Sequence, residues 1–237
     1  MIISSASLDI LGSDGKNINL VLDDTEILNH FLNPTSHIEC IVDKQINTDK
    51  IYDFYFKDKK DLVVIDAGAN VGMFSVHCSP SSKIIYAIEP TPSHFSILKK
   101  ITSKFKNIIP INCALWNKDE NLTFYIIPSN TTSNTIVNYG GQPMTVIGKT
   151  LQTIIKENNI PHIDLLKMDI EGSEFEILND EFINYCYSMV DNWFLEVHAF
   201  ARYCSNFTEC QEKVINMFKN NKYKVDIKGT DGMFIYK

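Results

Sequence analysis

The sequence predicts an α/β protein whose core is a mostly parallel, seven-stranded sheet, and three observations lead to this prediction. Five short apolar runs are bounded by turn residues, as expected for buried parallel strands. Amphipathic helical patterns lie between most of these runs, and alternating strands and helices favour a parallel sheet with helices on both faces. Two further runs surround a Gly-containing turn near the end of the chain, and they predict a hairpin that adds an antiparallel strand at one edge of the sheet.

The predicted elements alternate from Asp61 to the end of the chain. The strands comprise residues 62–66, 83–89, 108–115, 163–169 and 193–198, and the hairpin comprises residues 223–236. The helices comprise residues 93–104, 150–157, 173–183 and 208–220, and the last two begin with capping-box spacing, Ser173-x-x-Glu176 and Thr208-x-x-Gln211. Residues 117–149 interrupt the alternation, and they predict an inserted strand at 122–126 and a flexible loop near the site.

Two regions are expected, a small N-terminal cap of residues 1–50 and a main domain of residues 51–237. The first region is irregular, with polar turns and a short apolar run at 18–22, and a helical pattern follows at 48–56. It has too few apolar residues for a core of its own, so we expect it to cover the main domain.

Composition excludes several classes of function. The 237-residue chain has a net charge of −7 and Arg202 as its single arginine, which argues against nucleic acid or an anionic membrane as the main partner. No apolar run approaches the ~20 residues that span a bilayer. The first 15 residues also lack the pattern of a signal peptide, so we expect a cytoplasmic protein without a transmembrane segment. Six cysteines without a C-x-x-C pair predict reduced, mostly buried thiols. Nothing in the sequence predicts an oligomeric state.

A glycine-containing loop follows the first predicted strand, which ends in Asp66-Ala-Gly68-Ala-Asn70-Val-Gly72. Ligands of doubly wound sheets bind beyond the carboxyl ends of the strands. Gly68 lets a ligand approach the backbone closely, and Asn70 is the non-glycine residue that best tolerates a left-handed conformation. The spacing excludes the dinucleotide fingerprint G-x-G-x-x-G and resembles motif I of class I S-adenosylmethionine methyltransferases. A tight turn without any ligand stays an alternative.

Glu89 ends the second predicted strand and indicates a nucleoside ligand. An acidic residue at this place can accept hydrogen bonds from both ribose hydroxyls. NAD and S-adenosylmethionine share this feature, so Glu89 favours a nucleoside without identifying it. The structural alternative is an exposed carboxylate at the end of a strand.

A longer motif at the fourth strand indicates a family. The segment Asp164-Leu-Leu-Lys-Met-Asp169-Ile-Glu171-Gly172-Ser-Glu174, together with V-V-I-D-A-G-A-N-V-G upstream, resembles the FkbM-type methyltransferases over about residues 63–198. Thr150-Leu151 and the N-x-A-L pattern at Asn112 are also similar to that family. The resemblance implies a Rossmann-like class I methyltransferase fold with S-adenosylmethionine as the cofactor, and residues 1–50 carry no such match.

The resemblance also implies a role for each motif residue. Asp66, Gly68, Asn70 and Gly72 would shape the pocket for the methionine part of the cofactor, Glu89 would hold the ribose, and Asn112, Cys113 and Ala114 would flank the adenine. Asp169, Glu171 and Glu174 would line the methyl-transfer mouth, where Asp169 also touches the cofactor, Asp169 and Glu171 serve catalysis, and Glu174 contacts the acceptor. Trp116-Asn117 departs from the family pattern on the adenine side.

His198 ends the fifth predicted strand and is a candidate catalytic base. Methyl transfer to a hydroxyl needs a base or hydrogen-bond acceptor aligned with the nucleophile, and the ordinary pKa of histidine, about 6.5, suits that task. A half-buried histidine bonded to the chain is the alternative. His77, His94 and His162 are expected on helix or loop surfaces, without a role.

The acidic trio of Asp169, Glu171 and Glu174 leaves a metal site open, because carboxylate oxygens suit Mg²⁺. The two glutamates are also explained as residues of a first helical turn, where the helix dipole favours negative charge. An activated methyl sulfonium needs no Lewis acid, so we expect no metal.

The resemblance implies a methyltransferase that acts on a hydroxyl of a glycan or secondary metabolite. The missing D/N-P-P-Y/F motif after the fourth strand favours oxygen over nitrogen as the methylated atom. Two alternatives stay open: an N-methyltransferase acting on an amide or amine of a peptide or small molecule, and a nucleoside-binding module without catalysis.

Overall fold

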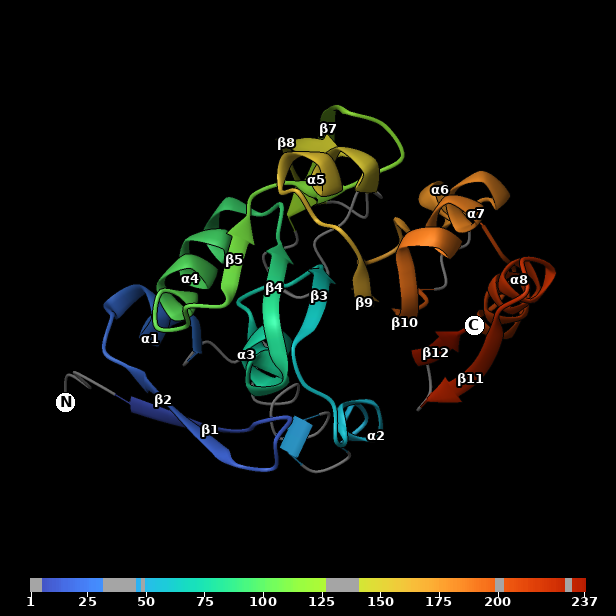
Figure 1. Cartoon of the computed structure of the whole chain (residues 1–237). Helices are drawn as coiled ribbons and strands as arrows, with labels where there is room; N and C mark the ends of the chain where they lie inside the picture. Colours follow the sequence, from blue (N-terminus) through green and yellow to red (C-terminus); the bar gives the residue numbers. More distant parts are fainter. Residues whose placement is uncertain (1–5, 32–45, 48–49, 127–140, 199–202, 229–231) are drawn as a thin grey trace.

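A seven-stranded sheet forms the centre of the computed structural model, with the strand order β11-β12-β10-β9-β3-β4-β5 (Figure 1). The structure describes residues 6–31, 46–47, 50–126, 141–198, 203–228 and 232–237. The strands are β3 (Leu62–Ala67), β4 (Ser82–Ile88), β5 (Ile108–Ile111), β9 (Ile163–Met168), β10 (Val190–Glu196), β11 (Lys224–Lys228) and β12 (Gly232–Tyr236). The predicted mostly parallel α/β sheet is confirmed, because β5, β4, β3, β9 and β10 pair in parallel.

The C-terminal hairpin is also confirmed, but its antiparallel strand is not the edge strand. β12 pairs antiparallel with both β10 and β11, so β12 lies second from the edge and β11 closes the sheet. Burial explains this order. Met233 and Ile235 of β12 are fully buried, whereas β11 is largely exposed, so the more apolar strand takes the inner place.

Helices cover both faces of the sheet. One face carries α3 (Met73–Cys78) and α4 (Pro92–Thr102), together with α1 (Thr25–Phe31). The other face carries α5 (Leu151–Glu157), α7 (Asp180–Met189) and α8 (Phe207–Asn220). The described residues also contain the short helices α2 (Asp53–Phe56) and α6 (Glu174–Ile177) and a 3₁₀ turn at Ser79–Ser81.

The N-terminal region is more regular than predicted. It contains the hairpin of β1 (Ala6–Leu11) and β2 (Asn17–Leu22), whose turn includes Gly15 at φ +79°, followed by α1. Its apolar side chains Ile10, Leu20 and Ile27 belong to the same buried cluster as α3 and α4. The described part of this region therefore packs against the layer of α3 and α4.

Two predicted helix boundaries were wrong. The single helix expected at 173–183 is divided into α6 and α7, and Asn179 begins α7 by accepting a hydrogen bond from the Phe182 amide. Helix α8 begins after Asn206, whose side chain accepts from the Glu209 amide, so the box at Thr208 does not form. Asn is a strong N-cap residue, and Asn206 takes the place of the cap predicted at Thr208. Ser173 does precede α6, but its side chain makes no capping hydrogen bond.

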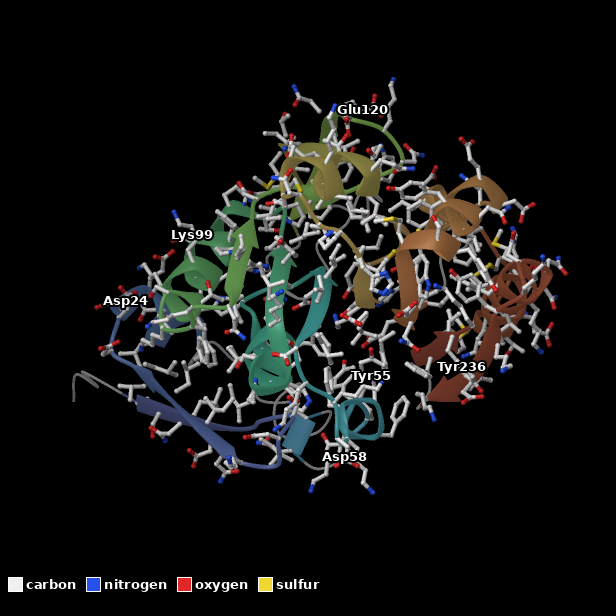
Figure 2. All side chains as sticks on the ribbon, in the orientation of Figure 1. Asp24, Tyr55, Asp58, Lys99, Glu120 and Tyr236 are labelled. Carbon is white, nitrogen blue, oxygen red and sulfur yellow. A yellow bond between two sulfur atoms is a disulfide. The ribbon has the colours of Figure 1, made fainter. Side chains whose placement is uncertain are left out.

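The region of 117–149 contributes two strands to a second, three-stranded sheet in the order β6-β8-β7. The inserted strand expected at 122–126 is the second part of β7 (Glu120–Ile126), whereas β8 (Gln142–Lys149) was not predicted. The strand expected at 108–115 is divided, because its last residues form the separate strand β6 (Ala114–Leu115) of the second sheet. Figure 2 shows Glu120 at the outer end of this sheet, away from the main one. Residues 127–140, which contain most of the predicted loop, lie outside the described residues.

The cysteines correct one prediction. Cys204 and Cys210 form a disulfide, which the expectation of reduced thiols throughout did not include. Cys78, Cys113 and Cys186 are buried free thiols, as predicted, and Cys40 lies outside the described residues. In the part of the chain that the structure describes, no helix is both long and apolar enough to cross a bilayer.

Candidate active site

A cavity of about 280 Å³ opens at the carboxyl ends of four adjacent strands, β10, β9, β3 and β4. Its lining includes six of the predicted site residues at these ends: Asp66, Gly68, Asn70, Glu89, Asp169 and Glu171. Ala114 and His198 also line it. Glu89 directly follows β4 and His198 follows β10, and β3 and β9 lie between these two strands. We therefore distinguish a β4 end of the cavity, with Glu89, from a β10 end, with His198.

The loop between β3 and α3 forms the middle of the cavity wall. Gly68, Asn70 and Gly72 all have positive φ values, of 79°, 52° and 93°. A Cβ atom on Gly68 would lie 1.7 Å from the carbonyl oxygen of Asp169, so glycine is required where the β3 loop meets the β9 loop. Gly72 is not part of the lining; a Cβ there would meet Leu98 of α4, which makes its role one of backbone packing.

Glu89 stands at the β4 end with its carboxylate held in place. Its oxygens accept hydrogen bonds from the amides of Asn70 (2.9 Å) and Thr91 (2.8 Å). Burial raises the pKa of Glu89 to about 7, although the two amides oppose the shift. Each carboxylate oxygen has a second lone-pair direction, so Glu89 can still accept from a ligand hydroxyl.

Two histidines lie inside the protein, which corrects the expectation of surface positions. His94 lines the cavity with its Nδ1 atom 3.8 Å from Glu89 Oε1, and burial lowers its pKa to about 4, so it is uncharged at neutral pH. His77 is fully buried and bonds the backbone oxygen of Leu11. His162 is partly exposed beside Asp191.

The three residues predicted beside adenine separate into two groups. Ala114 lines the cavity, together with Leu115 and with Phe124 of β7. Asn112 and Cys113 do not: the Asn112 side chain donates to the backbone oxygens of Glu89 and Pro90, and Cys113 is buried in the core. Asn112 therefore supports the loop that carries Glu89.

The β10 end carries the acidic residues and His198. The Nε2 atom of His198 lies 3.7 Å from Asp169 and 3.6 Å from Glu171, and its Nδ1 atom lies 3.1 Å from Glu174. Burial lowers the pKa of His198, but these carboxylates outweigh it and raise the pKa well above 6.5. His198 therefore carries a proton at neutral pH.

The acidic residues at this end differ in their protonation. Burial raises the pKa of Glu171 to about 8 against the attraction of His198. Burial also raises the pKa of Asp169, but the positive charges of Lys167 and His198 outweigh it and hold this pKa below its usual range. Glu174 is fully buried and outside the lining, and it accepts from the Ile170 amide and faces His198. The structure thus places Glu174 behind His198 and not on the surface that an acceptor would touch.

Lys167 is the site residue that the sequence analysis named only as part of a motif. Its ammonium lies 3.2 Å from Asp169 and 3.8 Å from Asp66, and these carboxylates keep it charged although it is buried. A lysine within the buried run from Leu165 to Met168, whose other residues are apolar, was the signal that could have identified it. Asp66 is fully buried and also accepts from the Ser75 hydroxyl at 2.6 Å.

The cavity fits a nucleoside linked to an amino acid. Glu89 offers a carboxylate to ribose hydroxyls at one end of the β3 loop. Asn70 Oδ1 and Asp66 Oδ1 are buried without a hydrogen-bond partner, so both can accept from a donor such as an ammonium group. These are the groups that S-adenosylmethionine requires.

Comparison with known proteins decides the family. Residues 66–225 match the family described as the Methyltransferase FkbM domain. The chain belongs to the FkbM methyltransferase family. It is therefore an enzyme that uses S-adenosylmethionine, and the match includes the carboxyl ends of the cavity's four strands.

Several relatives of this FkbM methyltransferase carry methyltransferase names. Methyltransferase 1 of Beauveria bassiana is 29% identical over 205 residues, which cover 73% of this chain and 79% of that protein. Hexuronic acid methyltransferase AglP of Haloferax volcanii is 25% identical over 142 residues, or 60% of this chain and 58% of AglP. Among solved structures, the fibrillarin of Aeropyrum pernix with bound S-adenosyl-L-methionine aligns with a TM-score of 0.46 and 13% identity, covering 75% of this chain and 66% of that one.

Replacing Glu89 by alanine should weaken binding of S-adenosylhomocysteine by about 1.5–3 kcal/mol, because the ribose loses hydrogen bonds to a charged group. Calorimetry measures the change. Since the pKa of Glu89 is about 7 and the carboxylate is the accepting form, the affinity of the unchanged enzyme should also fall as the pH drops below 7. Glu181→Ala, on the exposed side of α7, is the control. An unchanged affinity in Glu89→Ala would remove Glu89 from the ribose site.

Proposed function

We propose that this FkbM methyltransferase methylates a hydroxyl group of a glycan or secondary metabolite. The observation that carries the proposal is the group of Asp169, Glu171 and His198 at the β10 end, since β3 and β9 lie between β10 and the strand that carries Glu89. A hydroxyl that enters this end meets carboxylate oxygens, which accept its hydrogen bond. AglP, whose name states a hexuronic acid as its substrate, supports a sugar hydroxyl as the acceptor.

S-adenosylmethionine supplies a methyl group on a positively charged sulfur, which an oxygen nucleophile can displace. The chain's own residues then have two tasks, to hold the acceptor oxygen in line and to receive its proton. Asp169 is ionised at neutral pH and accepts the hydroxyl's hydrogen bond. His198 and Glu171 lie 3.6 Å apart, and either one can receive the hydroxyl's proton only after it has lost its own, so activity should rise with pH.

The test is a methyl-transfer screen with labelled cofactor against a cell extract, followed by identification of the methylated atom. Label on a hydroxyl oxygen supports the proposal. Label on an amide or amine nitrogen contradicts it and favours the N-methyltransferase. A protein that binds S-adenosylhomocysteine but transfers no label would point to the binding module.

Activity should survive removal of divalent metals by EDTA. Asp169, Glu196 and His198 offer ligand atoms within 4.8 Å of one another, which is the geometry that a metal could use. The Lys167 ammonium, however, already lies 3.2 Å from Asp169 and supplies positive charge there. Turnover with and without EDTA is the measurement. Complete loss that Mg²⁺ restores would make these residues metal ligands.

A further inference from the structure

Tyr52 belongs to the cavity although it precedes the residues that match the family, 66–225. Its side chain is 2% exposed, and its ring packs edge-on against Phe74 and Phe194, with centroids 4.8 and 4.6 Å away. Tyr55 of the following helix α2 points to the sheet in Figure 2 and donates to the backbone oxygen of Asp164 at 2.9 Å. The segment that contains Tyr52 and α2 is therefore anchored to the sheet, which places Tyr52 in the cavity wall.

The hydroxyl of Tyr52 donates a hydrogen bond to Glu196 Oε1 at 3.4 Å. Glu196 ends β10, is 7% exposed and lines the same cavity. Burial and the nearby carboxylates of Glu196, Asp169 and Asp66 raise the pKa of Tyr52 well above its usual range. Tyr52 is therefore a neutral donor at any physiological pH, and it orients the Glu196 carboxylate from one side.

Acidic groups dominate this part of the cavity. Four carboxylates line the β3, β9 and β10 positions: Asp66, Asp169, Glu171 and Glu196. Of the described lining residues, Lys167 and His198 carry positive charge at neutral pH, and each already lies within 4 Å of at least one carboxylate. His94 is uncharged at that pH. A carboxylate that entered with the acceptor would therefore find no cation among these residues that is not already paired with a carboxylate of the protein.

Resting on the proposed function, we infer that the acceptor is a neutral or amine-bearing polyol, and that Tyr52 and Glu196 determine this specificity. Hydroxyl and ammonium groups donate hydrogen bonds to carboxylate oxygens, whereas an acidic sugar such as a uronic acid places like charges side by side. Tyr52 and Glu196 thus bind a polyol acceptor through hydrogen bonds, and the Glu196 carboxylate repels an acidic sugar. Specificity for the polyol follows from both effects.

The test uses the full-length protein, labelled S-adenosylmethionine and the glycan and metabolite pool of a cell extract. Ion exchange separates the methylated products into acidic, neutral and basic fractions. We expect label on hydroxyl oxygens in the neutral and basic fractions to exceed that in the acidic fraction by at least about tenfold. In Glu196→Gln, which keeps the size but removes the charge, the ratio should fall several-fold. The matched control, Glu181→Gln on the exposed side of α7, should keep it.

Tyr52→Phe is the second variant, because it keeps the ring packing and removes the hydroxyl. It should raise the KM for the neutral acceptor several-fold and leave the Kd of S-adenosylhomocysteine unchanged, which a purely structural role would not do. O-linked label mainly in the acidic fraction would overturn this inference and leave O-methylation intact. Label on nitrogen would overturn the proposed function itself. An unchanged ratio in Glu196→Gln together with an unchanged KM in Tyr52→Phe would remove the pair from acceptor selection.

Discussion

His198→Ala should lower kcat by about 10²- to 10⁴-fold, the contribution of a general base, and should leave the affinity for S-adenosylhomocysteine nearly unchanged. His198 lies at the β10 end of the cavity, and two strands separate β10 from the strand that carries Glu89, so its loss should remove a proton acceptor and no ribose contact. Turnover and calorimetry are measured on the same preparation. A variant within a few-fold of wild-type turnover contradicts the prediction, and joint loss of binding and activity would show a structural role.

The pH profile identifies the base more directly. A base acts when it is deprotonated, so activity rises with pH through its pKa, and the carboxylates around His198 move that rise above pH 6.5. Glu174→Gln keeps an oxygen for the Nδ1 hydrogen bond and removes a charge, so it should lower the pKa of His198 and move the rise to lower pH. Glu181→Gln should leave the profile unchanged. If activity instead rises with pH through the range of ordinary carboxylate pKa values, Asp169 and Glu171 become the favoured proton acceptors.

Gly68→Ala should lower the free energy of unfolding by about 2–5 kcal/mol and abolish most activity. An alanine at φ +79° costs about 1–2 kcal/mol, and the Cβ atom 1.7 Å from the Asp169 backbone oxygen adds about 1–3 kcal/mol of forced displacement. The displaced backbone carries Asp169, so the β10 end of the cavity, where we expect the acceptor to bind, should move with it. Denaturant titration and turnover are the measurements.

Gly15→Ala is the matched control for this substitution. Gly15 has the same φ of +79° in the β1–β2 turn, but nothing lies within 4 Å of the added Cβ. The Gly15→Ala variant should therefore lose only about 1–2 kcal/mol of unfolding free energy, which is what alanine costs at this positive φ, and it should keep full activity. Equal losses of stability in the two variants would show that the approach of β3 and β9 is not the cause.

Periodicity and local motifs predicted most of the framework. The five parallel strands, the C-terminal hairpin and helices α4, α5 and α8 lie within a few residues of their predicted positions. The carboxyl ends of the strands also brought Asp66, Glu89, Asp169 and His198 to one cavity, as the rule for parallel sheets required. These features depend on residues that are near one another along the chain.

The sequence by itself determined the strands, the glycine loop and the acidic cluster, because their signals are short-range spacing and hydrophobic pattern. The tertiary structure decided which residues are buried and what they face. Tyr52 meets Glu196 across 144 positions, and His198 meets Glu174 across 24, so neither contact has a local signal. The raised pKa of His198 follows from such distant neighbours. Charge and burial are properties of the folded surroundings, and a sequence pattern does not contain them.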